Sequence, residues 1–87
     1  MNLLNIKTGH CICKTNIGYI ILDLRSKKLK VYQPQRIIER DFISMGIELL
    51  TSENWLPLKD LDYFDIAPRL KYSYLEEKFG NYFKNNF

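Results

Sequence analysis

The chain has 87 residues, of which 46% are hydrophobic and 26% charged, and its net charge is +3. This length allows one domain with a modest core, and this balance of apolar and charged residues excludes a mainly disordered chain. No apolar run approaches the roughly 20 residues of a membrane-spanning helix, and the N-terminal residues lack the pattern of a secretory signal. We therefore expect a single domain over residues 1–87 that does not insert into a membrane.

Residue usage adds a hint about origin. Ile, Lys, Asn, Tyr and Phe supply 37 of the 87 residues, whereas Ala occurs once. The codons of those five residues are AT-rich, which indicates an AT-rich genome. We expect the protein to work where it is made, in the cytoplasm, or in the plastid stroma if an organelle encodes it.

The first predicted element is a short strand over His10 to Lys14, which contains the motif His-Cys-Ile-Cys. On a strand, Cys11 and Cys13 share one face and His10 points to the other. A zinc site needs more ligands than the chain supplies nearby, and a Cys–His nucleophile needs an orienting partner. We therefore interpret the cysteines as buried, reduced core residues, and we expect no metal, no cofactor and no catalytic residue.

The strongest local pattern is GYIILDLRSKKLKVYQ, residues 18–33. Ile20, Leu22 and Leu24 alternate with other residues, and Leu29 and Val31 do so after the polar segment 25–28. Alternation with period two on both sides of a charged interruption predicts a β-hairpin. Together with the preceding strand it predicts an antiparallel meander.

The next segments predict helices around a fourth strand. Ile38, Phe42 and Met45 have helical spacing, Pro34 suits a helix start and Gly46 a left-handed cap, so we expect a helix over Gln35 to Met45. Further on we expect a strand at 47–51, an irregular segment or edge strand at 55–58, a helical turn at 59–65 and a C-terminal helix. A capping box of Ser73 and Glu76 would open that last helix.

These elements predict an α+β fold. A small antiparallel meander of three to four strands packs against the helix at 35–45, and the C-terminal helix closes the domain. The alternative is an SH3-like small barrel with appended helices, because short strands joined by tight turns also suit a curled sheet.

Charge is distributed unevenly along the chain. Residues 1–36 carry a net charge of +6, residues 37–65 carry −5, and residues 66–87 carry +2. Such polarity bears on partners rather than on fold. The basic hairpin predicts contacts to phosphates, with tyrosines available for base stacking. The candidate nucleic-acid-binding residues are Tyr19, Arg25, Lys27, Lys28, Lys30 and Tyr32.

The second half of the chain combines aromatic and acidic residues. Trp and Tyr are frequent at the centres of protein interfaces, and a small domain has limited room to bury many rings. Asp60, Asp62 and Asp65 lack the ligands and glycine of a calcium loop, so they indicate an acidic border around a Leu61 and Phe64 anchor. The candidate partner-binding residues are Trp55, Asp60, Asp62, Tyr63, Tyr72 and Tyr74.

We favour a non-enzymatic accessory or regulatory protein that binds a protein partner through this aromatic and acidic surface. The alternative is a small RNA- or DNA-binding module that uses the basic hairpin. An enzymatic role would require a pocket that brings His10 together with Asp60 or Asp62.

Overall fold

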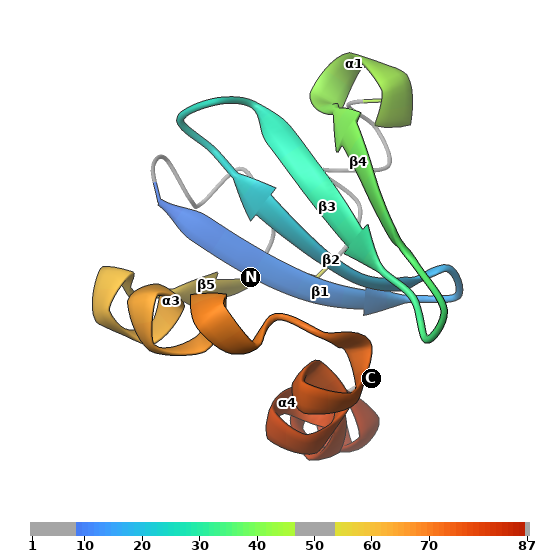
Figure 1. Cartoon of the computed structure of the whole chain (residues 1–87), viewed down its shortest axis with the longest axis vertical. Coiled ribbons are helices and arrows are strands. Elements are labelled where there is room, and N and C mark those ends of the chain that lie inside the picture. The colour runs from blue at the N-terminus through green and yellow to red at the C-terminus, as the bar shows by residue number, and fades with distance from the viewer. Residues whose placement is uncertain (1–8, 47–53, 87) are drawn as a thin grey trace.

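The computed structural model describes residues 9–46 and 54–86, and its fold is α+β, as predicted. Figure 1 shows its elements, which in chain order are β1 (His10–Thr15), β2 (Gly18–Asp23), β3 (Lys28–Tyr32), β4 (Ile37–Asp41), α1 (Phe42–Met45), β5 (Leu56–Leu58), α3 (Asp60–Ile66), the 3₁₀ helix η2 (Ala67–Arg69) and α4 (Tyr72–Asn86).

The strands of the described residues form one five-stranded antiparallel sheet in the order β4-β3-β2-β1-β5. The first four make a meander, and β5 adds to the far side of β1. The sheet is open, with β4 and β5 as its two edges, so the barrel alternative is wrong. The predicted strand at 47–51 lies outside the described residues.

The hairpin of β2 and β3 confirms the prediction from alternation. Its register pairs Asp23 with Lys28 at the turn and Tyr19 with Tyr32 at the open end. The Asp23 carboxylate accepts hydrogen bonds from the backbone N–H of Arg25 at 3.0 Å and of Ser26 at 3.5 Å. These bonds close the turn, because a short acidic side chain can satisfy backbone donors two and three residues ahead.

The helix expected at 35–45 is wrong over most of its length. Residues 37–41 form β4, which pairs with β3, and only Phe42–Met45 is helical. Spacing of four residues places Ile38 and Phe42 on one side of a helix, but it places them on one face of a strand as well. The spacing of Ile38 and Phe42 therefore does not distinguish a helix from a strand. The segment is a strand because it pairs with β3.

The end of the expected helix is confirmed at Gly46. Its backbone has φ 82°, a left-handed conformation that suits glycine, and its N–H donates to the carbonyl of Phe42. At the other end of α1, Asp41 is the N-cap and accepts a hydrogen bond of 2.8 Å from the N–H of Ser44.

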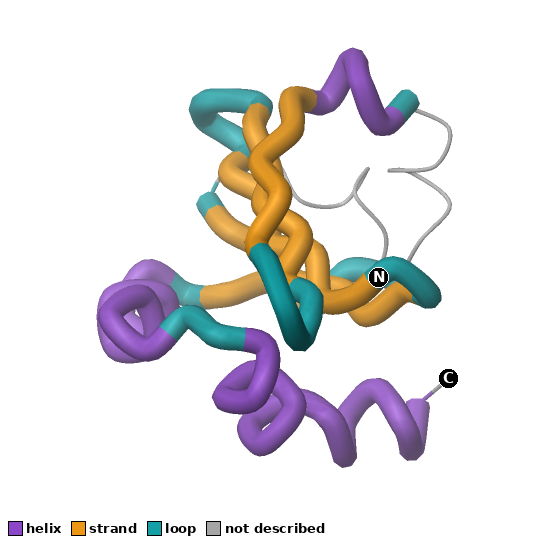
Figure 2. The backbone as a smooth tube through the Cα atoms, turned by 45° about the vertical axis from the view of Figure 1, so that its right-hand side comes forward, coloured by secondary structure: helices purple, strands orange, loops and turns teal. Residues whose placement is uncertain are grey.

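The sheet buries apolar side chains on both of its faces. Figures 1 and 2 show α3 and α4 together on one side of the sheet. Under these helices lie residues of β1, β2, β3 and β5, packed against helical side chains; the cluster is Ile12, Tyr19, Ile21, Tyr32, Leu58, Ile66, Leu75, Phe79 and Phe83. The opposite face carries Cys11, Cys13, Ile20, Leu22, Leu29, Val31 and Trp55.

The C-terminal elements largely follow the predictions. β5 is an edge strand that contains Pro57, α3 replaces the expected helical turn, and Leu75, Phe79 and Phe83 of α4 are buried. The expected capping box is wrong, because α4 begins at Tyr72 and includes Ser73. Glu76 instead accepts a hydrogen bond from Tyr19 of the sheet.

Candidate functional site

Trp55, a predicted docking residue, is buried in the core. It belongs to the cluster on the sheet face opposite to α3 and α4, together with Cys11 and Leu22. A buried indole has no surface to offer a partner in this structure. The prediction that Trp55 lies on a docking surface is therefore wrong, because the sheet has a second apolar face that needed a large side chain.

Two predicted tyrosines, Tyr63 and Tyr72, connect helices to the sheet, and a third, Tyr74, contacts the 3₁₀ helix η2. Tyr63 of α3 stacks on His10 of β1, with ring centroids 3.6 Å apart and ring planes 8° from parallel. The Tyr72 hydroxyl accepts a hydrogen bond of 3.2 Å from the Lys14 ammonium, and Tyr74 faces the guanidinium of Arg69 at 5.9 Å. All three are half-buried, so only part of each ring faces solvent.

Leu61 and Phe64, which were expected to anchor the acidic segment, are instead the exposed apolar residues of α3. Leu61 is 79% exposed and Phe64 is 71% exposed, whereas Ile66 is buried and Tyr63 half-buried. Both pairs have a spacing of three residues, so α3 has apolar residues on two sides. The spacing alone does not indicate which pair faces the sheet, because it is the same for both.

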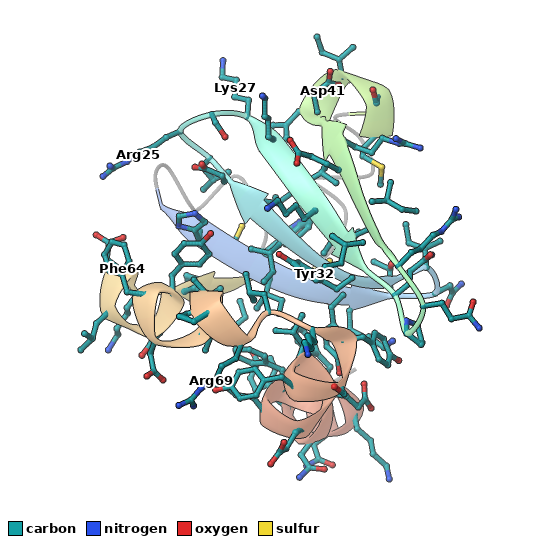
Figure 3. All side chains as sticks on the ribbon, in the orientation of Figure 1. Arg25, Lys27, Tyr32, Asp41, Phe64 and Arg69 are labelled. Atoms are coloured by element: carbon teal, nitrogen blue, oxygen red, sulfur yellow. The ribbon has the colours of Figure 1, made fainter. Side chains whose placement is uncertain are left out.

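Acidic residues border the exposed pair. Asp60 and Asp65 lie four residues from Phe64 and Leu61 respectively, so helical geometry places them beside those side chains. We call the residues Asp60, Leu61, Phe64 and Asp65 the α3 outer face. Phe64 projects from α3 at the periphery of the molecule, as Figure 3 shows. A hydrophobic pair with acidic neighbours suits a partner that is apolar and basic.

The charges of α3 are largely uncompensated. Asp60 and Asp62 are exposed in its first turn, where the positive end of the helix dipole favours them, and its last turn holds no basic residue. Asp65 reaches Lys78 of α4 at 3.9 Å, a distance at the limit of an ion pair. Exposed pairs of this kind contribute little to stability, so the three carboxylates leave α3 acidic.

The basic hairpin keeps its cations at the surface but not its stacking rings. Arg25, Lys27, Lys28 and Lys30 are exposed, and Figure 3 shows Arg25 and Lys27 at the outer end of the hairpin. Tyr19 and Tyr32 are 0% and 2% exposed, and burial raises the pKa of Tyr32 to about 12. The prediction that these two rings are available to bases is therefore wrong.

The motif around His10 divides between the two faces of the sheet, as strand geometry predicted. Cys11 and Cys13 are buried thiols on one face, and burial raises the pKa of Cys11 to about 12. His10 lies on the other face, and its Nδ1 is buried without a hydrogen-bond partner among the described residues. In residues 9–46 and 54–86 no three His, Cys, Asp or Glu side chains gather in the way that would hold a metal ion.

A cavity beside His10 contains acidic residues, but not those that an enzymatic role would need. Its lining includes Asp23 and Glu39 rather than Asp60 or Asp62. The expected condition for an enzyme, His10 in one pocket with either of those aspartates, is therefore not met by this cavity.

Two further findings concern the molecule as a whole. Among the described residues, no helix combines the length and the apolar character required to cross a membrane. Comparison with known protein families, with curated proteins and with solved structures finds no match, so a function for this chain has to be argued from its own residues.

Proposed function

We propose that this protein is a small non-enzymatic accessory protein that docks through the α3 outer face onto a basic, apolar segment of a partner protein. The observation that carries the proposal is the exposure of Leu61 and Phe64, 79% and 71%, side by side on a helix whose other side is held by Tyr63 and Ile66. Single exposed apolar residues are ordinary, but a large adjacent pair is a feature of interaction sites.

Burial of Leu61 and Phe64 would supply part of the free energy of binding. Burying one Leu or Phe side chain contributes about 1.5–3 kcal/mol, as an upper value before ordering costs are subtracted. Asp60 and Asp65 would add selectivity for a cationic partner and speed its encounter, since exposed charges act on association rate and choice of partner more than on affinity. The expected partner segment therefore has apolar residues interspersed with Lys or Arg.

A non-catalytic role is supported by the chemistry of the candidate nucleophile. The Cys11 thiol is buried and its pKa is raised to about 12, so it is protonated at neutral pH. A thiol is a far weaker nucleophile than a thiolate.

The direct test uses labelled peptides of defined chemistry. Three peptides of equal length are titrated with the protein while fluorescence anisotropy is recorded: one with leucine and lysine, one with leucine and glutamate, and one with serine and lysine. We expect the leucine–lysine peptide to bind most tightly. Binding that is equal for the serine–lysine peptide would contradict the proposal, because the apolar contact would then have no role.

The matched variants separate this face from general stickiness. The double variant Leu61→Ser with Phe64→Ser should weaken the binding of the leucine–lysine peptide by about tenfold or more, because a loss of about 1.4 kcal/mol of binding free energy corresponds to a factor of ten in affinity. Ile43→Ser is the control, since Ile43 is 92% exposed but lies on α1. If Ile43→Ser weakens binding as much as the α3 double variant, the α3 outer face is not the site.

A further inference from the structure

The sheet face under α3 and α4 has a corner that neither helix covers. The strand register aligns side chains in rows across this face, because cross-strand partners point to the same side. One row consists of Asp41, Lys28, Asp23 and His10, and the next of Glu39, Lys30, Ile21 and Ile12. Ile12 lies in the buried cluster with α4 residues, whereas Lys28, Lys30 and Glu39 are exposed.

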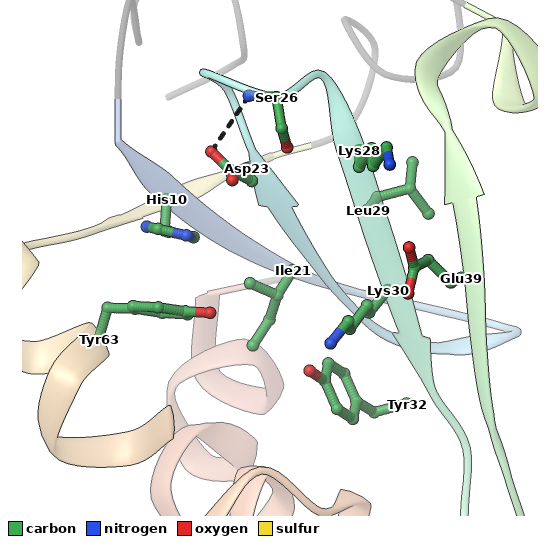
Figure 4. Close-up of a pocket in the computed structure, with 10 residues that line it drawn as sticks. All are labelled: His10, Ile21, Asp23, Ser26, Lys28, Leu29, Lys30, Tyr32, Glu39 and Tyr63. Carbon is green, nitrogen blue, oxygen red and sulfur yellow. Dashed lines mark hydrogen bonds between the residues drawn. The ribbon is translucent and has the colours of Figure 1, made fainter. Parts of the chain in front are cut away.

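This corner is hollow. It contains a cavity of about 200 Å³. Figure 4 shows His10 and Tyr63 at one end of the cavity, Lys30 and Tyr32 at the other, and Ile21 between them. The volume equals that of about seven liquid waters at about 30 Å³ each and lies below the roughly 300–1,000 Å³ of drug-sized sites. A ligand here would have the size of a single amino acid.

The charged groups around the cavity differ in whether they already have hydrogen-bond or ion-pair partners within the protein. The Asp23 carboxylate accepts two backbone hydrogen bonds in the turn. Within residues 9–46 and 54–86, the side chains of Lys28, Lys30 and Glu39 make no hydrogen bond or ion pair, although the Lys28 ammonium attracts the carboxylate of Asp41, its cross-strand neighbour. Two ammonium groups and one carboxylate are thus available at the rim, with Ile21 as an apolar floor.

We propose that this open corner, defined by Ile21, Lys28, Lys30, Glu39 and Tyr63, binds a small zwitterion with an apolar body, which is the chemistry of a free amino acid. Lys28 and Lys30 lie two residues apart on one strand face, so both ammonium groups can approach one ligand carboxylate. Glu39, the cross-strand neighbour of Lys30, receives the ligand's ammonium group. The apolar body covers Ile21 beside the ring of Tyr63.

The arrangement disfavours ligands with charge of one sign only. An anion without an amine would leave Glu39 unpaired beside it, and a cation without a carboxylate would meet Lys28 and Lys30. Discrimination of this kind follows from placing like charges against the wrong ligand. The site lies on the sheet, and the only residue it takes from α3 is Tyr63, on the opposite side from the α3 outer face, so this inference is independent of the docking proposal.

The test compares three probes that share a phenyl body: L-phenylalanine, 3-phenylpropanoate, which lacks the amine, and 2-phenylethylamine, which lacks the carboxylate. Each is titrated into the ¹⁵N-labelled protein while amide shifts are followed by NMR. We expect L-phenylalanine to shift the amides of residues 28–30 and 39, and to bind about tenfold more tightly than either analogue, the effect of one lost charge-assisted contact. Equal binding of the three probes, or no binding of L-phenylalanine, would overturn the proposal.

Variants identify the residues. Lys30→Gln and Glu39→Gln should each weaken the binding of L-phenylalanine about tenfold. Glu39→Gln should not weaken the binding of 3-phenylpropanoate, because that probe has no ammonium group. Lys84→Gln and Glu77→Gln are the matched controls, since both residues are exposed on α4. Leu61→Ser with Phe64→Ser should leave L-phenylalanine binding intact, which distinguishes failure of this site from failure of the docking face. If the control variants weaken the binding of L-phenylalanine as much as Lys30→Gln does, the assignment of the site to this corner is overturned.

Discussion

The hydroxyl of Tyr19 on β2 donates a hydrogen bond of 2.6 Å to the carboxylate of Glu76 on α4, 57 residues further along the chain. Tyr19 is 0% exposed. Burial and the neighbouring Glu76 together raise the pKa of Tyr19 above its ordinary value, so the phenol remains a donor at physiological pH. This bond connects the meander to the C-terminal helix.

Removing the Tyr19 hydroxyl should weaken the domain. We expect Tyr19→Phe to lower the free energy of unfolding by about 1 kcal/mol, at the lower end for a bond to a charged group, because the exposed Glu76 can be hydrated instead. Urea unfolding measures the change. Tyr74→Phe is the control, since the Tyr74 hydroxyl makes no hydrogen bond within residues 9–46 and 54–86. An unchanged stability for Tyr19→Phe would show that the bond contributes nothing net.

Gly80 lies beside this bond within α4. A Cβ at this position would lie 3.2 Å from Oε1 of Glu76 and 3.6 Å from the Tyr19 hydroxyl. Alanine in a helix is more favourable than glycine by about 1 kcal/mol, but the carboxylate held by Tyr19 has to shift. We expect Gly80→Ala to stabilise the protein by less than that value, and by the full value in a Glu76→Ala background. The same effect in both backgrounds would contradict the steric argument.

Acid should destabilise the domain through two carboxylates. Burial raises the pKa of Asp23, but hydrogen bonds from Ser26 and Arg25, with the nearby His10, outweigh it and hold that pKa below its ordinary 3.8. Backbone and side-chain hydrogen bonds from Ser44 lower the pKa of Asp41 in the same way. A carboxyl with a lowered folded-state pKa stabilises the fold above its ordinary pKa, and that contribution is lost as the pH falls through the folded-state value.

The midpoint of thermal unfolding should therefore fall as the pH is lowered below 3.8, the ordinary pKa of both aspartates. Asp23→Asn and Asp41→Asn should each reduce this fall, because a neutral side chain does not titrate. Melting curves followed by circular dichroism at a series of pH values measure the effect. Asn81→Ser, at an exposed position of α4 where neither residue titrates, is the control and should keep the wild-type dependence. If Asp23→Asn and Asp41→Asn both keep it as well, other groups are responsible.

The alternative function, nucleic-acid binding by the basic hairpin, makes its own prediction. With Tyr19 and Tyr32 buried, only contacts to phosphates remain, so any binding of single-stranded RNA should be insensitive to sequence and steeply dependent on salt. Lys27→Glu with Lys28→Glu removes two contacts and should flatten the slope of log K against log salt by about 1.4. Fluorescence anisotropy across a salt series measures the slope.

Lys71→Glu with Lys84→Glu reverses the same number of exposed charges on and beside α4, and it is the control. An effect as large as that of the hairpin variant would assign the binding to overall charge. RNA binding that neither salt nor the hairpin variant alters would exclude the basic hairpin as its site.

In the segment 35–45, the spacing of apolar residues does not distinguish a helix from a strand. Ile38 and Phe42 lie four residues apart, a spacing that suits one face of a helix and one face of a strand. Both side chains contact the same cluster on the sheet, which is what either structure would achieve. Pairing with β3 is a contact between strands, with Tyr32 opposite Ile37, and the spacing of apolar residues within 35–45 does not encode it.

The faces of the hairpin and of α3 show the same limit. The apolar face of Ile20, Leu22, Leu24, Leu29 and Val31 follows from alternation and is confirmed. The burial of Tyr19 and Tyr32 follows from the packing of α4, and the exposure of Leu61 and Phe64 from the choice of Tyr63 and Ile66 as the inner side of α3. These outcomes depend on which surfaces meet, and the candidate docking surface therefore loses Trp55 and keeps its part on α3.

The sequence by itself determined the α+β class, the β1–β3 meander and the cap at Gly46, because each depends on periodicity or on the conformational limits of one residue. Only the tertiary structure decided that β4 is a strand, that the sheet is covered on both faces, which rings remain exposed and where an open corner lies. Those features arise from contacts between elements, namely the pairing of β4 with the neighbouring β3 and the packing of α3 and α4 on the sheet. Burial is decided by what packs on a residue rather than by the residue itself.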